Sequence, residues 1–135
     1  MEDSGVWYVK IPGRPVPKTY SRKGSTMFKS RGVKQKEKEI GYRFRSKHGK
    51  LLLQADLFFS LLVNVPDRRH GDLKNYIYLA EDALSRIAYE DDRQIKKYVA
   101  PQVNVNKDEQ FTLITLGFLG EGFEKTILEE RYKFL

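Results

Sequence analysis

The chain has 135 residues, of which 40% are hydrophobic, and this length fits a single domain with one core. It contains no cysteine, which excludes disulfides and thiolate metal sites. Its 25 lysine and arginine residues outnumber 18 acidic residues, and the resulting net charge of +7 favours a polyanionic partner such as nucleic acid.

The first third of the chain predicts a strand, a long loop and a helix. Residues 6–11 are β-branched and aromatic, which is typical of a strand. Three prolines within residues 12–17 end it and enforce an extended backbone. The polar, basic segment 12–32 predicts a loop, and loops of this length are usually functional or disordered. Residues 33–48 then predict a basic helix.

The middle of the chain predicts a strand followed by the clearest helix. In the strand, residues 52–65, the alternate side chains from position 57 onward are apolar and should face the core. The helix is predicted over residues 72–87, because its apolar side chains recur at spacings of four and three residues. Asp72 occupies its N-cap position. Glu81 and Asp82 lie off the apolar stripe, so we expect them to face solvent.

The remaining segments predict a turn, two further strands and a tail. The turn covers residues 89–92, and the strands cover residues 94–105 and 111–119. Pro101 marks an edge, a bend or an end in the first of these strands. Residues 121–135 predict a short charged helix or a frayed tail. The expected fold class is therefore α+β: a small mixed four-stranded sheet packed with two main helices, in one domain over residues 1–135.

No segment indicates export or membrane insertion. The acidic first residues are followed by no apolar region of the signal-peptide type. The longest apolar stretch, residues 57–63, is too short to cross a bilayer. We therefore expect a cytoplasmic protein without a membrane partner, or a viral or prophage protein that acts in the host cytoplasm.

Charge is distributed unevenly along the chain. Between Lys18 and Lys50 only Glu37 and Glu39 oppose a run of basic residues, whereas acidic residues concentrate between Asp67 and Asp92. A nuclease that uses a metal ion needs both kinds of region, one for phosphates and one for the cation.

Carboxylates on either side of the second predicted helix are candidate metal ligands. Mg²⁺ prefers carboxylate oxygens, and phosphodiester hydrolysis gains from one or two such ions. Asp72 begins the helix, and Asp91 and Asp92 lie in the turn after it. A helix of about 16 residues is about 24 Å long, so these residues meet only if the turn folds back toward the helix start. Simpler interpretations stay open, with Asp72 as a cap and the aspartate pair as a solvated turn.

Several segments match one family pattern in the same order. These are residues 11–18 (IPGRPVPK), 66–75 (PDRRHGDLKN), 81–84 (EDAL) and 89–95 (YEDDRQI). The last three resemble the pattern PD…DxDN, a helix containing DAL, and (Y/F)xDDxQ(I/V) of the RusA family of Holliday-junction resolvases. The first resembles the opening strand and proline turn of that family. Together they cover most of the chain.

The resemblance implies a homodimeric, Mg²⁺-dependent endodeoxyribonuclease that cuts paired strands of four-way (Holliday) junctions in recombination and repair, with Mn²⁺ as an alternative ion. It makes Asp72 and Asp92 the metal ligands and Asp91 their support. It also implies that the turn aspartates approach the helix start. A further set of residues is expected to contact DNA: Lys18, Arg22, Lys23, Lys29, Arg31, Arg68, Arg69 and Asn75.

Two positions depart from the family pattern. Lys74 stands where the family has its second aspartate, and Tyr78 stands where many members have a lysine. Lys74 either repels the metal, unless another carboxylate such as Asp67, Asp82 or Asp91 compensates, or replaces that lysine one turn earlier on the same helix face.

Three functions follow as alternatives. The first is a junction-resolving nuclease in which Lys74 belongs to the catalytic group. The second, which Lys74 favours, is a catalytically weak or inactive protein that binds junctions and retains the fold. The third is a module that binds RNA through its basic face.

Overall fold

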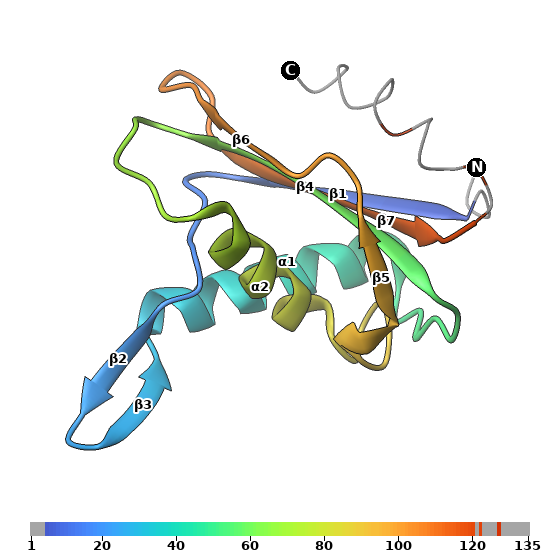
Figure 1. Ribbon diagram of the computed structural model, residues 1–135, viewed down its shortest axis with the longest axis horizontal. Helices are drawn as coiled ribbons and strands as arrows, with labels where there is room; N and C mark the ends of the chain where they lie inside the picture. The colour runs from blue at the N-terminus through green and yellow to red at the C-terminus, as the bar shows by residue number, and fades with distance from the viewer. Residues whose placement is uncertain (1–4, 121, 123–126, 128–135) are drawn as a thin grey trace.

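The computed structural model describes residues 5–120, 122 and 127. Its main layer is a mixed sheet with five strands in the described residues: β1 (Val6–Pro12), β7 (Phe111–Phe118), β4 (Leu57–Val65), β5 (Ile95–Tyr98) and β6 (Gln102–Val105). Strand β7 lies between β1 and β4 and pairs antiparallel with both. Strands β5 and β6 pair parallel with the first and second halves of β4. Figure 1 shows two helices, α1 (Arg31–His48) and α2 (Leu73–Leu84), on one side of this sheet.

Strand β4 is the centre of the core. All nine of its residues are buried. The predicted apolar face is confirmed, because Leu57, Phe59 and Leu61 belong to the same core cluster as residues of α1 and α2. The opposite face of β4 is buried too. There Leu62 forms a second core cluster with Phe111 and Leu113 of β7. A strand flanked by partners on both edges and buried on both faces forms the rigid centre of the domain.

The two helices touch closely at a glycine. Helix α1 begins at the cap residue Ser30, whose hydroxyl accepts a hydrogen bond from the Val33 amide at 3.3 Å. In its middle, a Cβ atom added to Gly41 would lie 3.0 Å from Ile87 Cδ1 and 3.2 Å from the Ala83 carbonyl oxygen. Close approach of the two backbones therefore depends on the missing side chain.

The α+β class, the mixed sheet and the two helices are confirmed, and the strand count is corrected from four to five. The predicted strand 94–105 is divided into β5 and β6, because Ala100 has a positive φ of 44° and Pro101 follows it. Strand β4 begins later than predicted, after Leu52 with its φ of 48°. Helix α2 ends earlier than predicted, because Ser85 has an extended backbone and Arg86 has a φ of 67°.

The predicted loop 12–32 contains a hairpin. Its strands β2 (Tyr20–Lys23) and β3 (Thr26–Lys29) pair antiparallel around a two-residue turn. Gly24, with a φ of 64°, takes the first central position of that turn, where a type II′ hairpin requires a positive φ. Gly-Ser between two strand-like segments is a hairpin signal that the sequence does contain.

Two predictions about the remaining parts have different outcomes. The tail predicted over residues 121–135 lies outside the described residues, except for 122 and 127. Within the described part of the chain, none of the helices is long and apolar enough to cross a membrane.

The helix contact predicts that two glycines of α1 respond differently to substitution. Gly41→Val should lower the free energy of unfolding by about 1–3 kcal/mol, because the added methyl groups overpack the contact with α2. A Cβ atom at Gly32 meets open space, so Gly32→Val should change the free energy by less than about 0.5 kcal/mol. Urea unfolding of both variants measures this difference, and equal midpoints would contradict the close helix contact.

Candidate functional site

The N-terminal proline segment holds the start of α2. The Lys18 amide donates to the Asn75 carbonyl at 2.9 Å, and the Gly71 amide donates to the Tyr76 hydroxyl at 3.0 Å. A Cβ atom at Gly71 would lie 2.8 Å from Pro17 Cβ. Two segments far apart in the sequence, both matched by the motif, therefore lie side by side at the first turn of α2.

Asp72 is exposed at this helix start and does not cap it. Its backbone has the extended conformation of an N-cap residue, but its side chain makes no capping hydrogen bond with the described residues. Lys74 is also exposed, and Asn75 is half-buried. The predicted pair Asp72 and Lys74 thus presents its charged groups to solvent in the first turn of α2, next to the partial positive charge of the helix terminus.

The loop before α2 adds two arginines to this end. Asp67 accepts a hydrogen bond from the Arg69 amide at 2.8 Å and holds the turn. The Arg68 and Arg69 side chains are both exposed, and the Arg69 guanidinium lies 3.8 Å from the Asp67 carboxylate. Asp67 is therefore a turn residue, and both arginine side chains are exposed in the loop that precedes the helix start.

The turn after α2 is fixed by Gln94. Its side-chain amide donates to the Leu53 and Ala55 carbonyls at 2.7 and 3.0 Å, while its oxygen accepts from the Glu90 and Asp91 amides. These bonds tie the turn to the segment that enters β4. The Tyr89 hydroxyl, which donates to the Glu81 carbonyl, ties the turn to the last turn of α2.

Asp91 and Asp92 have different environments in this turn. Asp91 caps a short 3-10 helix, Asp92–Gln94, and accepts from the Arg93 amide at 2.8 Å. That bond and the Arg93 guanidinium lower the pKa of Asp91 to about 2. Burial and the neighbouring carboxylates of Asp91 and Asp82 raise the pKa of Asp92. Asp91 is thus a structural carboxylate, and Asp92 contributes to an acidic cluster.

Glu81 is buried, contrary to the expected exposure, with 4% of its surface accessible. The Tyr98 hydroxyl donates to its carboxylate, and the Tyr89 hydroxyl donates to its carbonyl at 2.7 Å. Glu81 lies four residues after Ile77 on the helix, so it shares the row that the apolar stripe occupies. The prediction failed because Tyr98 of β5 and Tyr89 of the turn both contact Glu81. A count of apolar positions misses a buried carboxylate of this kind, although its spacing from Ile77 is a usable signal.

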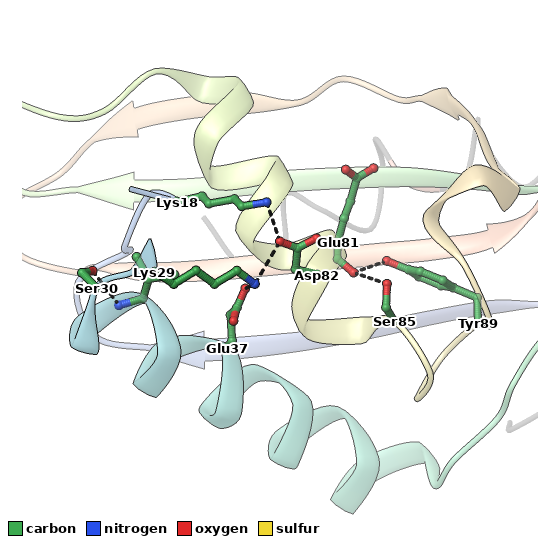
Figure 2. Close-up of polar contacts among 9 residues, drawn as sticks. Lys18, Lys29, Ser30, Glu37, Glu81, Asp82, Ser85 and Tyr89 are labelled. Carbon is green, nitrogen blue, oxygen red and sulfur yellow. Dashed lines mark hydrogen bonds and ion pairs between the residues drawn. The ribbon is translucent and has the colours of Figure 1, made fainter. Parts of the chain in front are cut away.

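Asp82 is an anchor for two basic residues rather than a solvated carboxylate. The Lys18 and Lys29 ammonium groups lie 2.7 and 3.3 Å from its carboxylate, and Lys29 also contacts Glu37 at 2.9 Å (Figure 2). Burial by itself would lower the pKa of Lys18, but the hydrogen bond to Asp82 raises it above its usual value. Of the predicted phosphate contacts, Lys18 and Lys29 are engaged inside the protein, whereas Arg22, Lys23 and Arg31 are exposed.

One chain does not bring the predicted metal ligands together. Asp72 lies at the start of α2, whereas Asp92 acts electrostatically on Glu81, near the other end. Helix α2 has 12 residues and is therefore about 18 Å long. Among the described residues, no group of three or more acidic or histidine side chains is placed to hold a metal ion. Within a single copy of the chain, a metal ion shared by Asp72 and Asp92 would need ligands from opposite ends of α2.

The sequence matches the model of a known protein family. The family model described as "Endodeoxyribonuclease RusA" matches residues 12–115, which include both ends of α2 and the hairpin. A search of curated proteins found no match.

The buried carboxylate predicts a specific pH dependence of stability. Burial, opposed by the hydrogen bond from Tyr98, raises the pKa of Glu81 above 4.5. A carboxyl group with a higher pKa in the folded state favours folding while protonated, so its ionisation costs stability as pH rises past 4.5. Glu81→Gln should therefore gain stability relative to wild type as the pH rises above 4.5. Urea unfolding at a series of pH values measures that difference.

Tyr98→Phe provides the matched control for this profile. Removing the hydroxyl removes a bond that lowers the pKa of Glu81, so this variant should lose stability more steeply than wild type over the same range. Parallel profiles for wild type and Glu81→Gln would show that Glu81 does not control the pH dependence.

Proposed function

The chain belongs to the RusA family of endodeoxyribonucleases, and from this we propose that it is a Mg²⁺-dependent enzyme that resolves four-way DNA junctions as a homodimer. The observation that best supports this proposal is at the first turn of α2, where the exposed Asp72 makes no capping bond with the described residues. Arg68, Arg69 and Lys74, which are close to it in the sequence, are exposed cations. A carboxylate among phosphate-binding groups suits phosphodiester hydrolysis.

Each metal site takes its ligands from two copies of the chain. Asp72 and Asp92 lie at opposite ends of α2 in one copy, which argues against a site within it. In a two-fold dimer a contact between residue i of one copy and residue j of its partner occurs twice, so Asp72 of one copy placed beside Asp92 of its partner would form two equivalent sites. Two equivalent sites match the two equivalent strands of a four-way junction.

The side chains of the site have separate tasks. Asp72 and Asp92 would hold Mg²⁺, or Mn²⁺ in its place, which supplies an activated water and stabilises the leaving oxygen. Asp91 supports Asp92 by fixing the turn. Arg68, Arg69 and Lys74 hold the phosphates that flank the cut, together with the exposed residues Arg22, Lys23, Arg31 and the half-buried Asn75.

A second function is favoured by Lys74. An ammonium group in place of a carboxylate changes the local charge by two units toward repulsion of a cation. A protein that binds junctions and cuts them weakly or not at all is the alternative. It retains the same fold and DNA contacts.

Mixing two inactive variants tests the shared site. Asp72→Asn and Asp92→Asn alone should each slow Mg²⁺-dependent cutting of a synthetic four-way junction by about 100-fold or more. Their heterodimer contains one site with both aspartates and one site with neither. The mixture should therefore recover about a quarter of the wild-type rate, as single nicks rather than paired cuts.

The control for this experiment is a mixture of Asp72→Asn with the double variant Asp72→Asn, Asp92→Asn, which contains no intact site and should stay inactive. No recovery in the test mixture, although heterodimers form, would place both ligands in one copy. Equal cutting by wild type and Asp72→Asn would contradict the nuclease assignment itself.

The variant Lys74→Asp distinguishes a junction-cutting enzyme from a protein that binds junctions without cutting them. If Lys74 holds a phosphate, this variant should bind the junction about tenfold more weakly, and the salt dependence of binding should lose about one ion. Its cutting rate should not rise above that of wild type. Lys107→Asp, at an exposed lysine of the β6–β7 loop, changes the net charge equally and is the control. Cutting by Lys74→Asp together with no cutting by wild type would favour the binding protein.

A further inference from the structure

The β2–β3 hairpin is an exposed ribbon of apolar and basic side chains. It projects away from the sheet and from both helices (Figure 1). Tyr20, Met27 and Phe28 are 49%, 52% and 41% exposed, and they are three of the eight exposed large hydrophobic residues in the described part of the chain. A ribbon of ten residues that carries this share of the exposed apolar surface indicates a binding surface.

The apolar side chains of the ribbon lie on both of its faces. Cross-strand partners share a face, so Tyr20, which pairs with Lys29, lies on the same side as Met27, which pairs with Arg22. Phe28, next to Met27 in the strand, lies on the opposite side. A ribbon that docks on a flat protein surface needs one apolar face only. Apolar groups on both faces suit a ligand that surrounds the ribbon.

The basic residues around the ribbon favour a polyanionic ligand. The sequence from Lys18 to Lys36 contains no acidic residue. Arg22 and Lys23 are exposed, and the Arg22 side chain lies against Met27, with 3.4 Å between Nε and Sδ. The Lys18 ammonium group lies 5.5 Å from the centre of the Tyr20 ring. Aromatic rings interleaved with cations are the surface on which unpaired nucleic-acid bases stack while their phosphates are neutralised.

The base of the ribbon is fixed to α2. Isolated two-stranded hairpins are marginally stable in water. Here Lys18 precedes β2 and Lys29 is the last residue of β3, and both contact the Asp82 carboxylate, which places this end of the ribbon against the helix (Figure 2). The ribbon is thus held at its base and open at its tip, and it has a defined position relative to the candidate site on α2.

We propose that the β2–β3 ribbon enters the branch point of a DNA junction, where Tyr20 and Phe28 stack on bases that the branch leaves unstacked. Arg22 and Lys23 contact the adjoining phosphates. The inference rests on the proposed function, because it takes branched DNA as the substrate. A continuous duplex offers no such base faces, so the ribbon favours a junction over a linear duplex, as apolar wedges do at distorted base steps.

The test compares binding of a labelled four-way junction and a linear duplex of the same sequence, without divalent ions so that no cutting occurs. The variant is Tyr20→Thr combined with Phe28→Thr, because threonine retains strand propensity. Its junction affinity should fall about 10- to 100-fold, while its duplex affinity should change by less than about twofold. Tyr42→Thr removes an aromatic ring that is 74% exposed on α1, and it should leave both affinities unchanged.

A conservative variant separates stacking from folding of the ribbon. Tyr20→Phe combined with Phe28→Tyr retains both rings and should bind the junction like wild type. A fluorescent base analogue, 2-aminopurine, placed at the branch point should be quenched by wild type and by this variant, but not by the threonine variant. Loss of the junction preference in the ring-retaining variant would overturn the proposal.

The remaining outcomes are distinct. A wild type that prefers the junction and a threonine variant with the same preference would overturn the stacking role alone. A wild type without any junction preference would overturn the proposed function together with it. Sedimentation shows whether the threonine variant has become a monomer, and that result would assign the ribbon to a second copy of the chain instead of DNA.

Discussion

The parallel pairing of β4 with β5 and β6 constrains the rest of this structure. Parallel neighbours cannot be joined by a tight turn, so the chain must return along its own length between them. Helix α2 makes that return, and its two ends lie at opposite ends of β4. Asp72 follows β4 and Asp92 precedes β5, so the topology itself separates them by the length of the helix. The hydrogen bonds from Gln94 to the Leu53 and Ala55 carbonyls hold the turn at residues 89–94 beside the segment that enters β4.

The same topology divides the charges of α2 between its ends. Cations gather at the start of the helix with Asp72, and carboxylates gather at its last turn with Asp92. The two ends of α2 are too far apart for the carboxylates of one end to neutralise the cations of the other. Asp82, which compensates Lys18 and Lys29, lies eight residues after Lys74, about 12 Å along the helix, and does not restore the carboxylate that Lys74 replaces. Asp91 is held by Arg93 at the far end, which leaves the first turn of α2 short of a negative charge.

Periodic patterns made much of this fold predictable from the sequence. The spacing of apolar side chains identifies α2, and the alternating pattern identifies β4 and β7, although the structure buries both faces of these two strands. Pairing partners were not predictable, because residues 94–105 are strand-like whether they pair parallel or antiparallel. The spacing of Glu81 from Ile77 is a local signal of its burial, but its hydrogen bond with Tyr98 of β5 depends on strand pairing and could not be predicted. The motif identified Asp72 and Asp92 as candidate ligands, but it could not show that the crossover keeps them apart in one copy.

Lys74 is best understood from the electrostatics of a helix start. The N-terminus of a helix carries a partial positive charge, so a lysine in the first turn is unfavourable unless an anion lies nearby. Arg68 and Arg69 add to the positive charge there. The carboxylate of Asp67 is already bonded to the Arg69 amide, so Asp72 is the acidic residue of the loop and first turn that is left to oppose this charge. Such an arrangement is costly in an isolated protein and favourable when a phosphate binds, because helix N-termini and basic side chains both stabilise phosphate. With Lys74 in place of a carboxylate, this end of α2 is better suited to hold the DNA backbone. A cation that binds beside Asp72 then depends more strongly on an aspartate from a second copy.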